Sequence, residues 1–445
     1  MNKYRGVKKS MDTYKRAGEL IPGWTQLVSR RPSQHANGVS PVYTQKAKGS
    51  RFTDIDGNEY IDWINAYSAV ILGHADDVVD TAVKEQIDRG SIYTVNSPLE
   101  IELAEELIDT IPSAEMVRYT RAGGEACALA VRIARGTAGK DKILFCGYHG
   151  WHDWYQSANY LADPVTGAFP FAGIEPIGVP KVLAGTAIPF TDGDLGMLEK
   201  LLKENSGEVA AIIMEPVRSS LPADGYLQGV KDLAHAHDAI LIFDEVSCGW
   251  RISRGGAQEY LGITPDMTVL AKAISNGYPM GAVVGSREVM EPAGQMFISS
   301  SYWSDNVGLT ASLTNIRELK RRDSNNQFKI LGEKISAVLQ EAIDSVGISA
   351  TVTGLHNKPT VSIDLPDESL EAKVNTLFIQ ELTKRGVITS GTGFMPTLAH
   401  TDEDIRLTGE AVSEALAIVM KGLEGNLDHL LEVSIKKEPF KRLVR

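Results

Sequence analysis

Short apolar runs alternate with longer amphipathic stretches between residues 76 and 310. The runs have the sequences MVRYT, KILFCG, VAAIIMEP, AILIFDE, MTVLA and GAVVG. They are rich in isoleucine, valine and leucine, with little alternation of apolar and polar positions, which is typical of parallel strands buried on both faces. The pattern predicts the α/β class, with a doubly wound, mainly parallel sheet whose ligands bind at the carboxyl ends of the strands.

The two ends of the chain have a different pattern. Residues 41–63 predict two short strands, with a turn inside the second one at DIDG. Residues 311–445 return to amphipathic helices with the short strands TVSIDLP and GVITSG. We expect residues 76–310 to form a large domain, and residues 1–75 and 311–445 to form together a smaller α+β domain.

Composition limits the partners and the compartment. The 445 residues carry a formal net charge of −12, which argues against nucleic acid and anionic membranes as partners. The three cysteines form neither a disulfide framework nor a metal-ligand spacing, which indicates a reducing compartment. No apolar run approaches a membrane span, and the first residues lack the apolar core of a signal peptide. We therefore expect a cytoplasmic protein.

A lysine and an aspartate each follow directly on an apolar run. An ammonium group at the end of a buried strand loses hydration, so Lys272 is either a surface residue just past the strand or an amine held for Schiff-base chemistry. Asp244 either caps the next turn or provides an anion against the pyridine nitrogen of pyridoxal 5′-phosphate (PLP). Taken alone, Lys272 favours the structural interpretation, which only its neighbouring motifs reverse.

Three further motifs leave two interpretations open. Gly123 and Gly124 begin a helix, where they either make an ordinary turn or let backbone N–H groups approach a phosphate. Tyr148 could stack on a pyridine ring, and the adjacent His149 is either a hydrogen-bonded structural residue or a catalytic one. Glu215 either orients ring groups through a neighbour or folds the turn that follows it.

In this order the motifs resemble the class III aminotransferases of the fold-type I PLP enzymes, and within them the glutamate-1-semialdehyde 2,1-aminomutase branch. The resemblance rests on GNEYIDW, ILGH, GGEACALAVRIARG, YHG, MEPV, FDEV and KAISNGYPMGAVVG. It implies a large PLP domain and a small domain built from both chain ends. It also implies that Lys272 holds PLP as a Schiff base, Asp244 pairs with the pyridine nitrogen, Tyr148 stacks on the ring, and Gly123 and Gly124 bind the phosphate.

The resemblance further implies a homodimer with shared active sites. Ser301 stands where the family usually has a phosphate-binding threonine supplied by the neighbouring subunit. Each site would then need a residue from both chains.

Departures from the aminomutase pattern fall mostly on the substrate pocket. Ala122 replaces a phosphate-binding serine, Tyr67 lies in the motif that carries a tryptophan in the aminomutase, and Thr392 stands in place of a glutamate. Arg30 occupies the place of a carboxylate-binding arginine, for which the adjacent Arg31 could substitute. These changes favour an aminotransferase that moves an amino group between a donor and a keto or aldehyde acceptor, with a carboxylate-bearing or sugar-related substrate.

Other functions remain open. An aminomutase-type isomerase or an amino-acid racemase would use the same cofactor set, and a non-catalytic relative would keep only the fold. A nucleotide-binding α/β protein would need a glycine-rich G-x-G-x-x-G or G-K-[ST] loop after the first strand, and the sequence has neither there. Residues 158–185, which are rich in glycine and proline, form either a lid over the site or a static surface loop.

Overall fold

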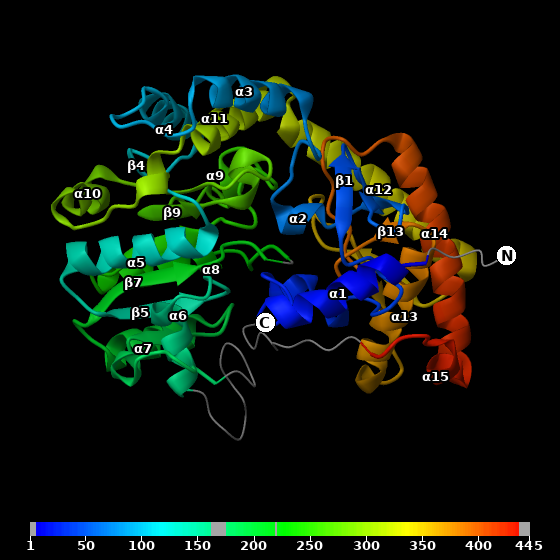
Figure 1. Cartoon of the computed structure of the whole chain (residues 1–445). Coiled ribbons are helices and arrows are strands. Elements are labelled where there is room, and N and C mark those ends of the chain that lie inside the picture. The colour runs from blue at the N-terminus through cyan, green and yellow to red at the C-terminus, as the bar shows by residue number, and fades with distance from the viewer. Residues whose placement is uncertain (1–5, 162–174, 219, 436–445) are drawn as a thin grey trace. The chain divides into compact units, whose positions relative to one another are not determined.

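Figure 1 shows the computed structural model, which describes residues 6–161, 175–218 and 220–435. The chain divides into two compact units. Among the described residues, one unit consists of residues 6–76 together with 326–435, and the other of the residues from Asp77 to Asn325. Each unit has its own hydrophobic core.

The unit Asp77–Asn325 is built around a mixed sheet. Within the described residues this sheet has seven strands, in the order β4-β10-β9-β8-β7-β5-β6. Strands β5 to β9 are parallel, whereas β10 is antiparallel to both of its neighbours. The strands are β4 (Met116–Thr120), β5 (Lys142–Cys146), β6 (Ala187–Pro189), β7 (Val209–Met214), β8 (Ile240–Asp244), β9 (Met267–Leu270) and β10 (Gly281–Gly285).

All six predicted runs are strands of this one sheet, so the predicted α/β fold with a mainly parallel sheet is confirmed. The antiparallel direction of β10 was not predicted, because a strand covered on both faces has the same apolar composition in either direction. The edge strand β6 was also missed, since three residues are too few to show a pattern.

Helices cover both faces of the sheet. In β5, Ile143 and Phe145 belong to the core cluster that contains α5, while the alternate residues Leu144 and Cys146 belong to a second core cluster with α7 and α8. This alternation explains why the strand sequence is apolar throughout. The helices are α5 (Gly123–Ala138), α7 (Leu195–Glu204) and α8 (Tyr226–Ala236).

The other helices of this unit frame the sheet. The long helix α11 (Asn306–Arg321) packs against α3 (Asp77–Arg89) and α4 (Leu99–Thr110). Residues 162–174, the middle of the possible lid, lie outside the described residues. The shorter elements are α6 (Asp153–Gln156), η3 (Ser157–Leu161), η4 (Lys181–Leu183), α9 (Gly256–Leu261), η5 (Lys272–Ser275), α10 (Arg287–Met290), η6 (Glu291–Gln295) and η7 (Ser301–Ser304).

The other unit combines the two ends of the chain. Its described strands form a sheet β1-β2-β3-β13 and a hairpin β11-β12. The strands are β1 (Thr44–Lys48), β2 (Arg51–Asp54), β3 (Glu59–Asp62), β11 (Ala350–Thr353), β12 (Thr360–Ile363) and β13 (Val387–Ile388). The helices are α1 (Lys8–Leu20), η1 (Val28–Arg30), η2 (Pro32–Gln34), α2 (Asn65–Ser68), α12 (Ser324–Val346), η8 (Glu368–Leu370), α13 (Glu371–Lys384), α14 (Asp402–Lys421), η9 (Gly422–Asn426) and α15 (Leu427–Leu430).

The turn at DIDG divides the second predicted strand of residues 41–63 into β2 and β3. Asp54 accepts hydrogen bonds from the backbone N–H groups of Asp56 and Asn58, which closes the turn. The Asp56 carboxylate accepts those of Lys9 and Ser10 at 2.7 and 2.9 Å, so it caps the start of α1. Both aspartates therefore have structural roles.

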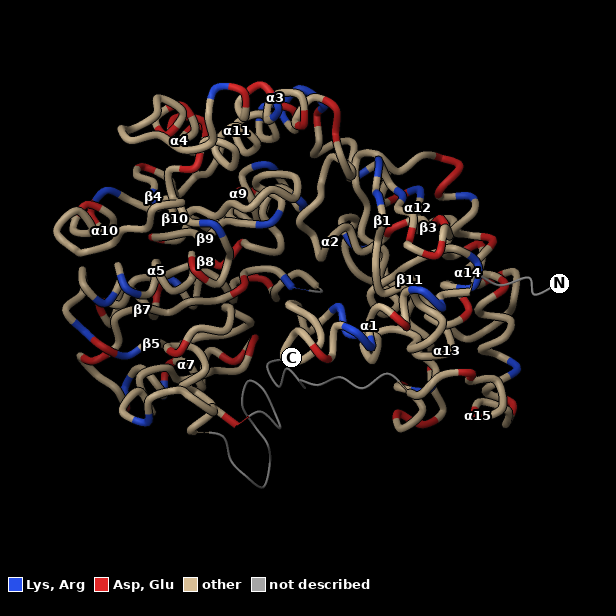
Figure 2. Tube along the Cα trace, viewed as in Figure 1, with Lys and Arg blue, Asp and Glu red and all other residues tan. Residues whose placement is uncertain are grey.

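Charged residues of both signs are interspersed along both units (Figure 2). Among the described residues, no helix is long and apolar enough to cross a membrane.

Candidate active site

Asp244 and Lys272 lie at the carboxyl edge of the central sheet. Asp244 is the last residue of β8 and pairs in register with Val269 of the parallel strand β9. Lys272 follows the end of β9 by two residues and begins η5. Parallel strands end at the same edge, so the two side chains arise from adjacent positions there.

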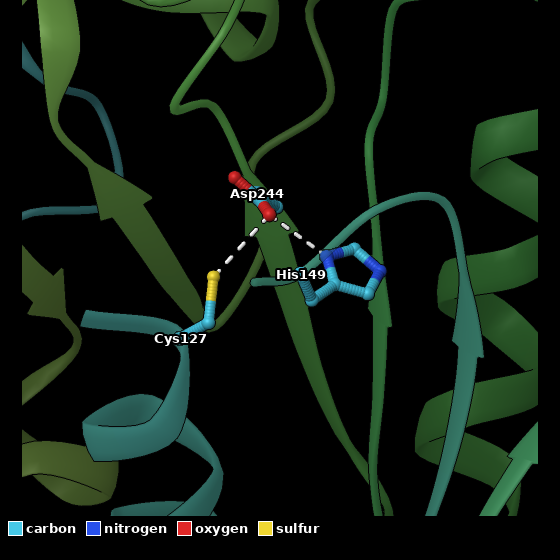
Figure 3. Close-up of side chains that lie close together, drawn as sticks. All are labelled: Cys127, His149 and Asp244. Atoms are coloured by element: carbon cyan, nitrogen blue, oxygen red, sulfur yellow. Dashed lines mark hydrogen bonds and ion pairs between the residues drawn. The ribbon is translucent and has the colours of Figure 1, made fainter. Parts of the chain in front are cut away.

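The Asp244 carboxylate is buried and hydrogen-bonded on both oxygens. Only 3% of the residue is exposed. Its Oδ2 accepts hydrogen bonds from His149 Nδ1 at 2.7 Å and from Cys127 Sγ at 3.3 Å (Figure 3), and its Oδ1 accepts one from the backbone N–H of Val246 at 3.0 Å. A buried carboxylate needs such donors to offset its lost hydration.

The Cys127 thiol and the His149 ring are fully enclosed. Burial, followed by the nearby Asp244 charge, raises the pKa of the Cys127 thiol well above its usual value, so the group stays protonated as an S–H donor. The His149 ring packs edge-on against Phe145 and Tyr155. Its Nε2 atom is buried and has no hydrogen-bond partner within the described part of the chain.

Lys272 has an unusual backbone conformation. Its φ angle is +49°, in the left-handed region that residues other than glycine rarely adopt. The short helix η5 that it begins is held by Asn315 of α11, whose Nδ2 donates to the carbonyls of Ala273 and Ile274. The Lys272 Nζ atom donates to Ser247 Oγ at 2.7 Å. A strained backbone that surrounding contacts hold in place is common at functional sites.

The start of α5 is closely packed. Gly123 and Gly124 are its first residues, and the side chain of the N-cap residue Ala122 makes no capping hydrogen bond among the described residues. A Cβ atom on Gly123 would lie 2.9 Å from Val246 Cγ1, and one on Gly150 would lie 2.6 Å from the Gly124 Cα atom. The local packing therefore requires glycine at positions 123 and 150, and the positive end of the helix dipole at the start of α5 favours an anion.

Tyr148 is positioned by Glu215. The backbone N–H of Tyr148 donates to Glu215 Oε2 at 3.0 Å, and Arg218 Nε lies 3.5 Å from the same oxygen. The Tyr148 side chain is 39% exposed. Glu215 therefore ties the loop after β5 to the end of β7.

Ser301 is exposed at the first residue of η7. The residues around it present large apolar side chains, because Phe297 is 86% and Tyr302 69% exposed.

Arg30 and Tyr67 belong to the unit formed by the chain ends, where they are close to each other. The Tyr67 hydroxyl donates to the carbonyl of Ser29, and His35 Nε2 lies 3.3 Å from that hydroxyl and 3.2 Å from that carbonyl. Burial raises the pKa of Tyr67, and the positive charge of Arg30 opposes that rise. Arg30 itself is exposed.

Tyr67 lies in a left-handed turn. The four residues of α2, Asn65–Ser68, all have positive φ angles between 50° and 77°. Asp62 Oδ1 accepts the N–H groups of Ile64 and Asn65, and Asn65 Nδ2 donates to the Met395 carbonyl at 2.6 Å. These contacts hold the turn in an arrangement that costs roughly 1–2 kcal/mol per residue.

Thr392, which stands where the aminomutase has a glutamate, contributes to the backbone hydrogen bonds of the same unit. The carbonyl of Thr392 accepts the N–H of Val361 at 3.0 Å. The nearby His400 stacks on Trp63 with ring centroids 3.9 Å apart, and burial lowers its pKa to about 4. His400 is therefore a neutral core residue.

Two contacts at the site were not predicted. Cys127 lies one helical turn after Gly123, so the helical repeat could have placed it on the face that carries the site. Ser247 follows Asp244 by three residues, and no sequence signal distinguishes it from an ordinary turn serine.

These residues fit PLP. The buried carboxylate of Asp244 suits a cationic ring nitrogen, the Lys272 amine suits an aldehyde, and the glycine-rich start of α5 suits a phosphate.

Comparison with known proteins agrees with this chemistry. The family profile described as aminotransferase class-III matches residues 33–416. The 3-aminobutyryl-CoA aminotransferase of Cloacimonas acidaminovorans is 33% identical over 427 residues, covering 94% of this chain and 99% of that protein. The glutamate-1-semialdehyde 2,1-aminomutase of Desulforamulus reducens is also 33% identical, over 433 residues, covering 93% and 99%.

A solved structure described as a transaminase with PLP bound superimposes with a TM-score of 0.82 at 26% identity, covering 94% of this chain and 99% of the other. The predicted resemblance, fold type and cofactor are confirmed. The chain therefore belongs to the class III aminotransferases, a family of PLP-dependent enzymes.

Proposed function

We propose that this PLP-dependent aminotransferase moves an amino group between two separate molecules, with Lys272 and Asp244 as its central residues. The observation that carries the proposal is their adjacency at the carboxyl edge of the sheet, where Asp244 is buried among donors and the Lys272 amine is held by Ser247.

The proposed residue roles follow from charge and reach. When bound, PLP supplies an electron sink for the electrons left on the substrate carbon after its proton is removed. Asp244 holds a proton on the ring nitrogen, while the first N–H groups of α5 at Gly123 and Gly124 bind the phosphate. Tyr148, fixed by Glu215, covers a face of the ring.

Lys272 has two tasks in this proposal. Its amine holds the cofactor covalently in the resting enzyme, and once released it takes the proton from the substrate carbon and returns it to a neighbouring atom. Ser247 accepts a hydrogen bond from the amine at 2.7 Å and limits its movement.

We further propose that Arg30 binds a carboxylate of the substrate. Arg30 is exposed, it stands where the resembling aminomutase has a carboxylate-binding arginine, and Tyr67 beside it is locked to Ser29. A guanidinium group can bind a carboxylate through two parallel hydrogen bonds. A sugar-related substrate remains the less supported choice.

An isomerase is the second candidate, because several relatives, including that of Methanothermobacter thermautotrophicus at 35% identity, are named glutamate-1-semialdehyde 2,1-aminomutase. Transfer is favoured by Tyr67 and Thr392, which depart from the aminomutase pattern, and by the aminotransferase name of a relative at 33% identity. A racemase has no comparable support.

We also propose a homodimer in which Ser301 serves the partner's site. The exposed apolar side chains of Phe297 and Tyr302 flank Ser301, and exposed apolar groups of this size mark contact surfaces. A serine hydroxyl there can donate to a phosphate.

The first prediction concerns the need for an acceptor. An aminotransferase given an amino donor alone should stop after about one product molecule per active site, and added pyruvate should restore continuous turnover. Product is measured by chromatography with and without pyruvate. Continuous conversion of glutamate 1-semialdehyde without any acceptor would instead establish the isomerase.

The second prediction concerns Lys272. Lys272→Ala should lose the visible absorbance of covalently held PLP and at least about 100-fold in kcat, because the amine is both the attachment point and the proton carrier. Absorbance and mass after borohydride reduction measure the attachment, with Lys140→Ala as the control. Cofactor still attached covalently in Lys272→Ala would refute the assignment.

The third prediction concerns Arg30. Arg30→Ala should raise KM for an amino-acid donor about 10- to 100-fold, the value of one charge-assisted interaction, and leave PLP affinity unchanged. The corresponding amine without a carboxylate is the control donor, and its KM should not change. If Arg31→Ala has the larger effect, Arg31 holds the carboxylate.

The fourth prediction tests shared sites by mixing inactive variants. Ser301→Asp brings a negative charge to the partner's phosphate, so this variant and Lys272→Ala should both be inactive. After the two are unfolded and refolded together, about a quarter of the wild-type activity should return, because each mixed dimer has one site without either defect. No recovery, with mixed dimers present by native mass spectrometry, would assign both residues to one chain.

A further inference from the structure

Cys127 contacts Asp244 but has no part in the chemistry described above. It lies one turn into α5, is 1% exposed, and places its Sγ atom 3.3 Å from Asp244 Oδ2. The same oxygen accepts the 2.7 Å hydrogen bond from His149 Nδ1 (Figure 3).

Cys127 and His149 both donate to the same acceptor, Asp244 Oδ2. A thiol is a weak donor, yet a donor aimed at a buried carboxylate takes up part of its capacity to accept further hydrogen bonds. Because burial raises the pKa of Cys127 well above its usual value, the thiol is protonated at neutral pH and its S–H group is available as a donor.

We propose that Cys127 is a positioning residue that limits how strongly Asp244 binds the ring nitrogen of the cofactor. The inference rests on the proposed role of Asp244. Removing the thiol leaves the buried carboxylate short of a donor in the cofactor-free protein, and a protonated ring nitrogen then compensates for that loss. Thermodynamic linkage requires that a variant destabilised more in its free form than in its loaded form binds the cofactor more tightly.

If Cys127 served only to fill the core, its substitution would not tighten cofactor binding. Cys127 belongs to the core cluster between α5 and the sheet, so a poorly fitting substitute would disturb the free and loaded proteins alike. Affinity would then be unchanged or weaker, and the nature of the ligand's ring would make no difference.

The test measures the dissociation constant of pyridoxamine phosphate, which forms no covalent link to Lys272, by fluorescence titration of the cofactor-free protein. Cys127→Val removes the donor and leaves no room for a replacing water, so it should bind about three- to tenfold more tightly than the wild type. Cys127→Ser keeps a donor and should stay within about twofold. Cys146→Val, a matched change in the other core cluster of the sheet, should bind like the wild type.

A second ligand tests whether the effect depends on the ring nitrogen. It is an analogue of pyridoxamine phosphate in which a C–H group replaces that nitrogen. This ligand should bind Cys127→Val and the wild type equally, because it offers Asp244 no donor. Unchanged or weaker binding of pyridoxamine phosphate by Cys127→Val, or an equal gain with the analogue, would overturn the inference. If Cys127→Val fails to fold, Cys127→Ala takes its place with the same expected sign. Wild-type protein that does not bind pyridoxamine phosphate would refute the proposed function itself.

Discussion

Burying a carboxylate at the end of a strand removes its hydration, at a free-energy cost of roughly several kcal/mol. The protein must offset this cost with hydrogen bonds to the carboxylate. At Asp244 the donors come from three separate places: His149 in the loop after β5, Cys127 in α5, and the backbone N–H of Val246 in the turn after β8. Satisfying this one group therefore fixes the relative positions of a helix start and two strand ends.

The same three segments carry several other residues of the proposed cofactor site. The loop that brings His149 also brings Tyr148, the helix that brings Cys127 begins with Gly123 and Gly124, and the turn after Asp244 contains Ser247, which accepts the hydrogen bond from Lys272. The donors of Asp244 and the groups proposed to bind the ring and the phosphate are thus parts of the same short segments. Substitutions that displace one of these segments are expected to disturb several cofactor contacts together.

The sequence predicted the central sheet well, because strands buried on both faces have an apolar composition that is hard to mistake. It also predicted which residues lie at the carboxyl edge, since that follows from where each apolar run ends. The helical repeat could have placed Cys127 on the face of the site, but it does not identify Asp244 as its partner, which lies 117 positions away in the chain. Nor could the sequence predict β6, which is too short to show a pattern of apolar residues, or the direction of β10, which does not change its apolar composition.

Backbone strain is the other property that the sequence did not reveal. Lys272 and the residues Asn65–Ser68 adopt left-handed conformations without being glycine. The first is held by Asn315, which is distant in the sequence, and the second by Asp62, which lies just before it. A glycine at any of these positions would remove the strain, but a glycine has neither the amine of Lys272 nor the hydroxyl of Tyr67. The proposed role of Lys272 requires a side chain where the backbone prefers glycine, and the surrounding hydrogen bonds help to offset the free energy that this conformation costs.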